Sequence, residues 1–199
     1  MTREEARTEL VEGMDNKKNT ILETTILVMG KDGLHSSMKN VVKQAKCSET
    51  LIYKYYGTRK KLMFACFDSI CNELRVELSV LSASDISSKE EFKNYIRGIW
   101  DILYQYFKNN EERRRFFAQY CSDLKYDSKN TTILRIVKNI LNDNYSFFYE
   151  YYGDWACLMF MQIVFEAILV SSSPSNDESL DNSNDAFDIL LVGLKHHFK

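Results

Sequence analysis

Residues 36–62 read SSMKNVVKQAKCSETLIYKYYGTRKKL, and this stretch decides the fold of the chain. Apolar residues recur at helical spacing in its first part, which predicts a short helix with one apolar face. Either serine of the pair 36–37 can cap that helix. A tight turn at 46–47 leads into a second short helix, which Ser48 caps and Gly57 ends. Because helices this short are unstable alone in water, both must pack against their neighbours.

The second helix has an inner and an outer face. Ile52 and Tyr56 lie four residues apart and can pack inward, whereas Glu49 and Lys54 stay outside. Thr58 caps a third helix directly afterwards. Two short helices joined by a tight turn are the layout of a helix-turn-helix, whose second helix enters the major groove of DNA. The stretch therefore predicts a DNA-binding head.

The same residues carry a family resemblance. The pattern S-x-x-x-[LI]-Y-x-Y-[FY]-x-[ST]-[KR]-x-x-L resembles the DNA-binding signature of TetR-family transcriptional repressors. It is met here by Ser48, Ile52, Tyr53, Tyr55, Tyr56, Thr58, Arg59 and Leu62. Upstream, residues 21–25 with Gly33 resemble the family's first helix and the turn after it. The resemblance covers residues 17–65 and implies an all-α homodimer that binds DNA through this head.

Two positions depart from the family pattern. The turn usually has glycine where Lys46 stands. If that residue needs a positive φ, lysine costs about 1 kcal/mol there. A serine or threonine is common where Leu51 stands, so base contacts cannot be copied from relatives.

Charge is unevenly divided along the chain. The 199 residues carry a net charge of −2, made up of −3 for residues 1–16, +7 for residues 17–62 and −6 for residues 63–199. The basic segment coincides with the helix-turn-helix, as phosphate binding requires. A basic run alone is also typical of an ordinary solvated face, so the coincidence with the motif is what favours DNA binding. The acidic residues of segment 1–15 argue against a minor-groove arm.

The predicted DNA contacts combine phosphate-binding and base-reading side chains. The predicted DNA-binding residues are Ser37, Lys39, Ser48, Glu49, Thr50, Leu51, Tyr53, Lys54, Tyr55, Arg59, Lys60 and Lys61. The basic residues, together with the helix N-terminus after Thr58, suit phosphates. The resemblance implies that Tyr53 and Tyr55 also bind phosphate. Glu49 can accept a hydrogen bond from cytosine and Leu51 can contact a thymine methyl, although Glu49 can equally stabilise the helix N-terminus without touching a base.

The rest of the chain also reads as helical, since it has one proline and seven glycines. We predict an all-α protein of about nine helices. An N-terminal three-helix helix-turn-helix domain is followed by a C-terminal helical ligand-binding and dimerisation domain. Its segments are a polar arm at 1–15, the DNA-binding domain at 16–62, a connecting helix at 58–81 and the C-terminal domain at 82–199.

The C-terminal domain has its own helix signals. A capping box at residues 88–91 opens a helix that the pair 109–110 interrupts, and another helix follows at 111–125. Further predicted helices occupy residues 130–152, 154–171 and 186–197, with a polar loop at 171–185.

Aromatic side chains are concentrated in residues 89–152, where they can line an apolar cavity. The predicted ligand-binding residues are Trp100, Tyr104, Phe107, Phe117, Tyr120, Tyr145, Phe148 and Glu166. Plain core packing must account for most of these residues, because aromatic residues at helical spacing also build cores. Asp101 or Glu166 can favour a cationic ligand, although Asp101 can equally lie on the surface.

The last two predicted helices are apolar enough to form a four-helix interface with a second copy of the chain. The predicted dimerisation residues are Leu158, Met161, Phe165, Phe187, Leu190, Leu191 and Leu194. A homodimer places two recognition helices about 34 Å apart, on successive faces of the major groove. The TetR-family resemblance implies the same arrangement.

Catalytic and metal-binding patterns are missing from the sequence. The histidines lie beside a turn, at His35, and at the C-terminal end, at 196–197. Cys66 and Cys71 are five apart on a helix, which does not suit zinc. No P-loop, G-x-S-x-G or G-x-G-x-x-G is present. We therefore predict a protein that is not an enzyme and that needs no cofactor or metal.

The cysteines and the apolar segments indicate where in the cell the protein is expected. Five cysteines without a CxxC motif fit reduced thiols, and the charged N-terminus is no export signal. The most apolar run, 155–171, contains Gln162 and Glu166 and is too short to span a bilayer. The sequence predicts a cytoplasmic protein without a membrane partner.

These observations predict a homodimeric repressor that a small, largely apolar or aromatic ligand releases from a palindromic DNA operator. Ligand binding is expected to shift the connecting helix at 58–81 and change the separation of the heads. Two alternatives stay open. One is a small-molecule-binding helical protein with a vestigial helix-turn-helix, and the other is a TetR-like activator without ligand control. An all-α enzyme is disfavoured.

Overall fold

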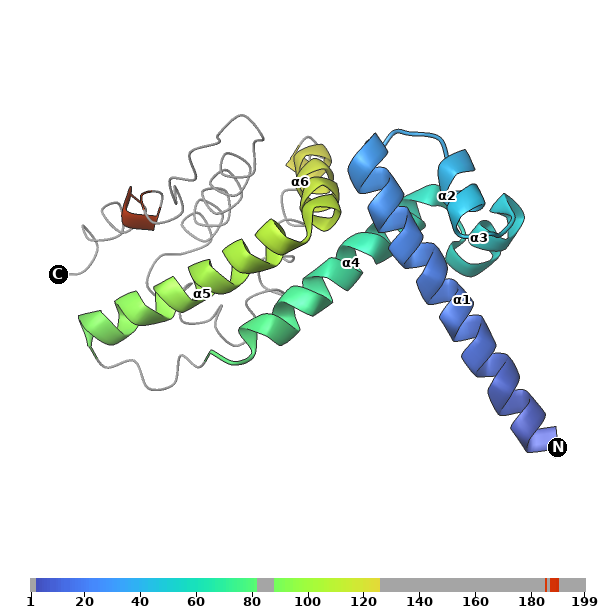
Figure 1. Ribbon diagram of the computed structural model, residues 1–199, viewed down its shortest axis with the longest axis horizontal. Helices are drawn as coiled ribbons and strands as arrows, with labels where there is room; N and C mark the ends of the chain where they lie inside the picture. The colour runs from blue at the N-terminus through green and yellow to red at the C-terminus, as the bar shows by residue number, and fades with distance from the viewer. Residues whose placement is uncertain (1–2, 82–87, 126–184, 186, 190–199) are drawn as a thin grey trace. The chain divides into compact units, whose positions relative to one another are not determined.

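A computed structural model describes residues 3–81, 88–125, 185 and 187–189 (Figure 1). Every regular element within these ranges is a helix, so the predicted all-α class is confirmed. The helices are α1 (Arg3–Asp32), α2 (Lys39–Gln44), α3 (Glu49–Tyr56), α4 (Arg59–Leu78), α5 (Lys89–Asn109) and α6 (Glu111–Lys125). Residues 185 and 187–189 are also helical. The predicted helices at 130–152 and 154–171 lie outside the described residues.

The chain divides into two compact units. The head unit comprises Met1–Ile70 and Glu112–Tyr120, and the body unit comprises Cys71–Glu111 and Cys121–Lys199. Helices α4 and α6 therefore contribute residues to both units. This division differs from the predicted one, in which every residue from 82 onward belonged to the C-terminal domain, because the first part of α6 packs with the head.

Helix α1 is longer than the sequence predicts. It was expected to begin at Asn16, after a polar arm, but it begins at Arg3. The arm is rich in Glu, Arg and Ala, which are good helix formers, so it continues the helix towards the N-terminus. Figure 1 shows this part of α1 extending away from α2 and α3. The other end of α1 supplies Ile21, Ile26 and Met29 to the core of the head, all three fully buried.

The helix-turn-helix forms where it was predicted. At α3, the Ser48 hydroxyl accepts a hydrogen bond from the Leu51 amide at 3.1 Å, which confirms the predicted cap. Ile52 and Tyr56 are buried, as expected for the inner face. At α2, the hydroxyl of Ser37, two residues before the helix begins, accepts from the Lys39 amide at 3.3 Å, although the N-cap position itself is Met38.

The turn between α2 and α3 contains a strained residue. Lys46 has a φ of 48°, in the left-handed region that disfavours a side chain. Lys46→Gly is therefore expected to raise the free energy of unfolding by about 0.5–1 kcal/mol, net of the extra freedom of glycine in the unfolded chain. Chemical denaturation measures this change. Lys43→Gly, in the exposed face of α2, is the control and is expected to destabilise the protein by about 1 kcal/mol. Equal losses in both variants contradict the strain at Lys46.

Helix α1 also holds the central turn and the end of the helix-turn-helix. The Lys17 ammonium donates to the carbonyls of Ala45 and Lys46, at 2.8 and 3.2 Å, where α2 ends. The Tyr56 hydroxyl, at the end of α3, donates to the Lys18 carbonyl at 2.8 Å. The Lys17 bonds satisfy carbonyl groups that are left open where α2 ends, and the Tyr56 bond ties the end of α3 to α1.

Tyr56 gives the head a pH dependence. Burial raises the pKa of Tyr56 from 10.0 to about 12, and the thiol of Cys66 adds to this rise. The stabilising effect of neutral Tyr56 is complete below pH 10 and is lost as the pH rises to 12. Tyr56→Phe is expected to cost about 1 kcal/mol at pH 7, through the lost hydrogen bond. It should then lose stability less steeply than the wild type between pH 10 and 12. Denaturation curves at a series of pH values test this, and parallel pH profiles contradict it.

The body unit begins with the predicted capping box. The Glu91 amide donates to the Ser88 hydroxyl at 3.2 Å, and the Ser88 amide donates to the Glu91 carboxylate at 2.9 Å. Helix α5 then runs to Asn109, and α6 begins at Glu111, as the break at 109–110 predicted. The buried face of α5 carries Tyr95, Ile96, Ile99, Trp100, Leu103, Tyr104 and Phe107.

Candidate nucleic-acid interface

The predicted DNA-binding residues all lie in the head unit, and most of them are open to solvent. The exposed members are Ser37, Lys39, Ser48, Glu49, Thr50, Lys54, Lys60 and Lys61. Leu51, Tyr53, Tyr55 and Arg59 are half-buried. Within α3, the buried pair Ile52 and Tyr56 faces the core, so the exposed residues occupy the opposite face. A helix is about 10–12 Å wide with its side chains, which matches the width of the major groove.

Two side chains on α3 interact with each other. Partial burial raises the pKa of Tyr53. A hydrogen bond to Glu49 and the negative charge of that carboxylate raise the pKa further, whereas the positive charge of Arg59 lowers it. The Tyr53 hydroxyl thus donates to Glu49, one helical turn earlier. Glu49 therefore has a partner within α3, a possibility that the sequence analysis did not consider.

Arg59 has a structural role that was not predicted. Its guanidinium group donates to the carbonyls of Leu34 and Ser36, at 2.7 and 2.5 Å, in the turn between α1 and α2. The same group lies 3.8 Å from the sulfur of Met29. These bonds direct the Nη2 of Arg59 into the head, and the phosphate contact of Arg59 stays a prediction.

The start of α4 presents the remaining basic residues. The Thr58 hydroxyl accepts from the Lys61 amide at 3.2 Å, which confirms the predicted cap. Lys60 and Lys61 are exposed in this first turn. Their ammonium groups add to the positive end of the α4 dipole, an arrangement that attracts phosphate.

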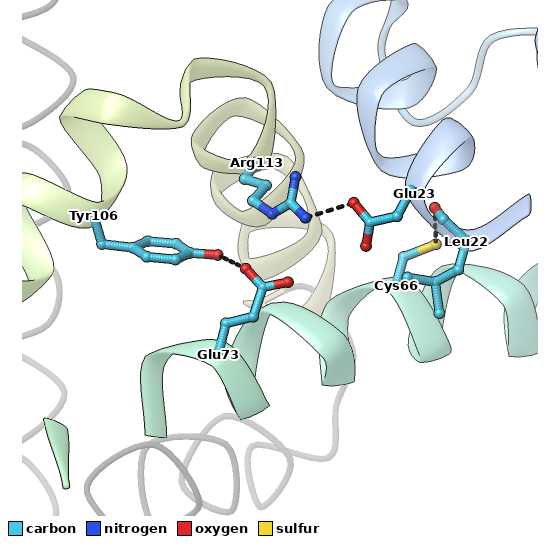
Figure 2. A network of polar contacts seen from close by, with 6 residues as sticks. All are labelled: Leu22, Glu23, Cys66, Glu73, Tyr106 and Arg113. Carbon is cyan, nitrogen blue, oxygen red and sulfur yellow. Dashed lines mark hydrogen bonds and ion pairs between the residues drawn. The ribbon is translucent and has the colours of Figure 1, made fainter. Parts of the chain in front are cut away.

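Helix α6 packs tightly into the head (Figure 2). The Arg113 guanidinium forms an ion pair with Glu23 of α1 at 2.5 Å. Nearby, a Cβ placed on Gly30 of α1 would lie 2.1 Å from the Glu112 carbonyl oxygen, so only glycine allows this approach. In α4, the Cys66 thiol lies 3.7 Å from the Leu22 carbonyl. Burial strongly raises the pKa of that thiol.

Two predicted ligand-binding residues belong to this packing. The ring of Phe67 stacks on Phe117 at 4.7 Å and on Tyr120 at 4.6 Å between centroids. Phe117 is 1 % exposed. These contacts are core packing, the alternative that the sequence left open, and the ligand-binding role of both residues stays a prediction. Helical spacing marked Phe117 and Tyr120 as apolar, but it did not show that they pack on α4 in the head.

The body unit contains the other described members of the predicted ligand-binding set. Trp100, Tyr104 and Phe107 are buried on α5. In the same unit, the Tyr106 hydroxyl donates to the Glu73 carboxylate of α4 at 2.5 Å (Figure 2). Tyr145, Phe148 and Glu166 lie outside the described residues. Asp101 is exposed and forms an ion pair with Arg97 at 2.9 Å. It therefore lies on the surface, which was the alternative to a role in binding a cationic ligand.

One predicted dimerisation residue packs within the chain instead. Phe187 is 2 % exposed, its ring lies 5.5 Å from that of Trp100, and the guanidinium of Arg97 covers it at 4.7 Å. These contacts within the chain were not predicted, and the dimerisation role of Phe187 stays a prediction. Two residues further along, Ile189 is 71 % exposed. The other predicted dimerisation residues, Leu158, Met161, Phe165, Leu190, Leu191 and Leu194, lie outside the described residues.

Neither a metal-binding cluster nor a membrane-spanning helix occurs in the described ranges of the chain. Among those residues, no three His, Cys, Asp or Glu side chains gather into a group that could hold a metal ion. No helix in that part of the chain is long and apolar enough to cross a bilayer.

Comparison with solved structures decides the fold. A TetR-family transcription regulator from Marinobacter aquaeolei VT8 is similar with a TM-score of 0.64 at 17 % identity, over 87 % of this chain and 95 % of that one. A TetR-like transcriptional regulator from Rhodococcus sp. RHA1 is similar with a TM-score of 0.60 at 12 % identity, over 90 % and 96 % of the two chains. This chain has the TetR fold. No protein-family model and no curated relative matches its sequence.

The TetR fold confirms the resemblance that the helix-turn-helix residues suggested. The fatty acid degradation regulator FadR from Bacillus halodurans shares it too, with a TM-score of 0.63 at 12 % identity over 88 % of this chain and 94 % of that one. At such identities the role of each residue must be argued from this chain itself. Lys17, Gly30 and Gln119 are important contacts of this TetR fold that the sequence analysis missed, because each partner lies far away along the chain.

Proposed function

We propose that this protein is a sequence-specific DNA-binding transcriptional regulator. The observation that carries the proposal is the outer face of α3, where Glu49, Thr50 and Lys54 are exposed on a helix whose opposite face is buried. This face lies within the segment of charge +7 at residues 17–62. Phosphate attraction and a helix with exposed polar side chains are the two requirements of major-groove recognition.

Within this function, lysines bind phosphate and α3 reads bases. Lys39, Lys54, Lys60 and Lys61 are exposed and suit phosphate oxygens. Glu49 and Leu51 lie in the first turn of α3, where the recognition helix of a helix-turn-helix contacts base edges. A carboxylate there favours a cytosine amino group and an apolar side chain favours a thymine methyl.

We propose that the regulator is a homodimer acting on a palindromic operator. A two-fold dimer presents two recognition helices about 34 Å apart, one turn of DNA. In this proposal Ile189, which is 71 % exposed near the C-terminal end, is one of the apolar side chains that the interface covers.

The proposed regulation is release of DNA by a small, largely apolar or aromatic ligand, which makes the protein a repressor. Buried Trp100, Tyr104 and Phe107 supply suitable apolar surface on α5. Helix α4 contributes residues to both units, so a ligand that shifts α4 changes the separation of the heads. A ligand that leaves the affinity for DNA and the distance between spin labels at position 43 unchanged contradicts this mechanism.

Selection of bound sites from random duplex DNA tests the proposed function. The wild type is expected to enrich a palindrome with two matching half-sites. The variant Tyr53→Ala, Lys54→Ala is the control, because both side chains lie on the partly or fully exposed surface of α3. Loss of the enrichment in this variant supports recognition by α3. If the wild type enriches no sequence, the protein is not a specific reader of DNA.

A further inference from the structure

The turn between α1 and α2 determines where the helix-turn-helix begins. It spans residues 33–38, and Gly33 enters it with a φ of 94°, which only glycine adopts easily. Within the turn, the Ser36 amide and hydroxyl both donate to the Gly33 carbonyl, at 3.1 and 2.7 Å. Helix α2, which follows, has only six residues, and no side chain caps it at Met38. A helix this short depends on its surroundings for its position.

The backbone of Leu34 is held from two sides. Its amide donates to the side-chain oxygen of Gln119 on α6 at 3.0 Å, across 85 residues of sequence. Its carbonyl accepts from Arg59 on α4 at 2.7 Å. Leu34 itself is 7 % exposed. Both polar groups of one buried peptide segment are thus satisfied by side chains from two other helices, and losing either partner leaves a buried group without its bond.

Gln119 is itself well fixed. It belongs to the part of α6 that packs in the head, between Phe117 and Tyr120, whose rings both stack on Phe67. The Arg113–Glu23 ion pair fixes the same helix two turns earlier. Because α6 is held at these points, the position of the Gln119 side chain is set by packing, and Gln119 in turn sets the position of Leu34.

We propose that Gln119 is a positioning residue for DNA binding. By accepting a hydrogen bond from the Leu34 amide, Gln119 holds the turn at 33–38. Helices α2 and α3 therefore stay in positions from which both can engage one groove of the DNA. This inference rests on the proposed function, since it concerns how well the head binds DNA. It adds a residue of α6, outside the predicted DNA-binding set, that determines affinity through the backbone of the turn.

The test compares Gln119→Leu, which removes the acceptor at similar volume, with Gln119→Glu, which keeps it. Gln105→Leu, at an exposed position on α5, is the matched control. Two quantities are measured on the full chain. One is the exchange rate of the Leu34 amide by NMR without DNA, and the other is the affinity for the duplex that the wild type enriches from random DNA.

Gln119→Leu is expected to speed exchange of the Leu34 amide and to weaken duplex binding by about three- to tenfold, the range that one lost hydrogen bond supports. Gln119→Glu should restore the slow exchange and recover most of the affinity, whereas Gln105→Leu should change neither quantity. Restoration by glutamate separates positioning from a general loss of packing at this site.

Three results overturn the inference. Unchanged exchange of the Leu34 amide in Gln119→Leu means that the bond does not hold the turn. Faster exchange of the Leu34 amide with unchanged affinity for the duplex means that the turn does not position α2 and α3 for DNA binding. If the wild type enriches no duplex, the inference falls with the proposed function. The exchange data then still report separately whether Gln119 holds Leu34.

Discussion

Replacing Gly30 with alanine is expected to lower the free energy of unfolding by about 3 kcal/mol, the upper part of the range for overpacked sites. The added Cβ would lie 2.1 Å from the carbonyl oxygen of Glu112, a backbone atom that no side-chain rotation can move away. Either α6 separates from α1 or both helices shift. Chemical denaturation of the full chain measures the loss.

Gly98→Ala is the matched control for this prediction. There the added Cβ would meet the end of the Leu81 side chain at 3.0 Å, and a flexible side chain can move. Alanine also favours the helix over glycine by about 1 kcal/mol, so Gly98→Ala should stay within about 1 kcal/mol of the wild type. A Gly30→Ala protein as stable as Gly98→Ala shows that α6 does not approach α1 as described.

Arg59→Ala is expected to destabilise the head by about 3 kcal/mol, because it removes two charge-assisted hydrogen bonds and leaves two carbonyls without their partner. These carbonyls belong to Leu34 and Ser36. Lys60→Ala, at the next position, should change the free energy of unfolding by less than about 0.5 kcal/mol, since Lys60 is exposed.

The effect of Lys60→Ala should appear in DNA binding and not in stability. Lys60→Ala should weaken binding to all sequences alike and reduce the salt slope by about one, the signature of one lost phosphate contact. Arg59→Lys should restore only part of the stability, because both bonds come from the single nitrogen Nη2, which the shorter lysine side chain does not reach. Equal stability of Arg59→Ala and Lys60→Ala contradicts the structural role of Arg59.

Local features of the fold could be predicted from the sequence. Ser48, Gly57 and the Ser88–Glu91 box mark helix ends because their bonds reach only three or four residues along the chain. The inward face of α3 follows from the spacing of Ile52 and Tyr56 for the same reason. The head, built from such short-range signals, was therefore predicted well.

Contacts between distant segments could not be predicted in this way. Two such contacts join Gly30 to Glu112 and Leu34 to Gln119. These residues come together only when the chain folds, and the local sequence around either one does not predict its partner. Apolar spacing likewise identifies a buried residue without naming its partner. The contact of Phe187 with Trp100 was therefore not predicted.

Arg59 illustrates a further limit of sequence reasoning. A basic residue in a basic stretch is usually read as a phosphate contact, and Lys60 and Lys61 next to it are exposed. Arg59 differs because it reaches two carbonyls of the turn before α2. That turn lies next to Arg59 only in the folded chain.

The central claim is that the exposed face of α3 reads a DNA sequence. Its most direct test is the affinity of the wild type for its selected duplex and for a scrambled duplex of the same composition, each over a range of salt concentrations. We predict that the selected duplex binds at least about a thousandfold more tightly and that both affinities fall steeply with salt. Equal affinities for the two duplexes, whatever their salt dependence, would contradict the claim.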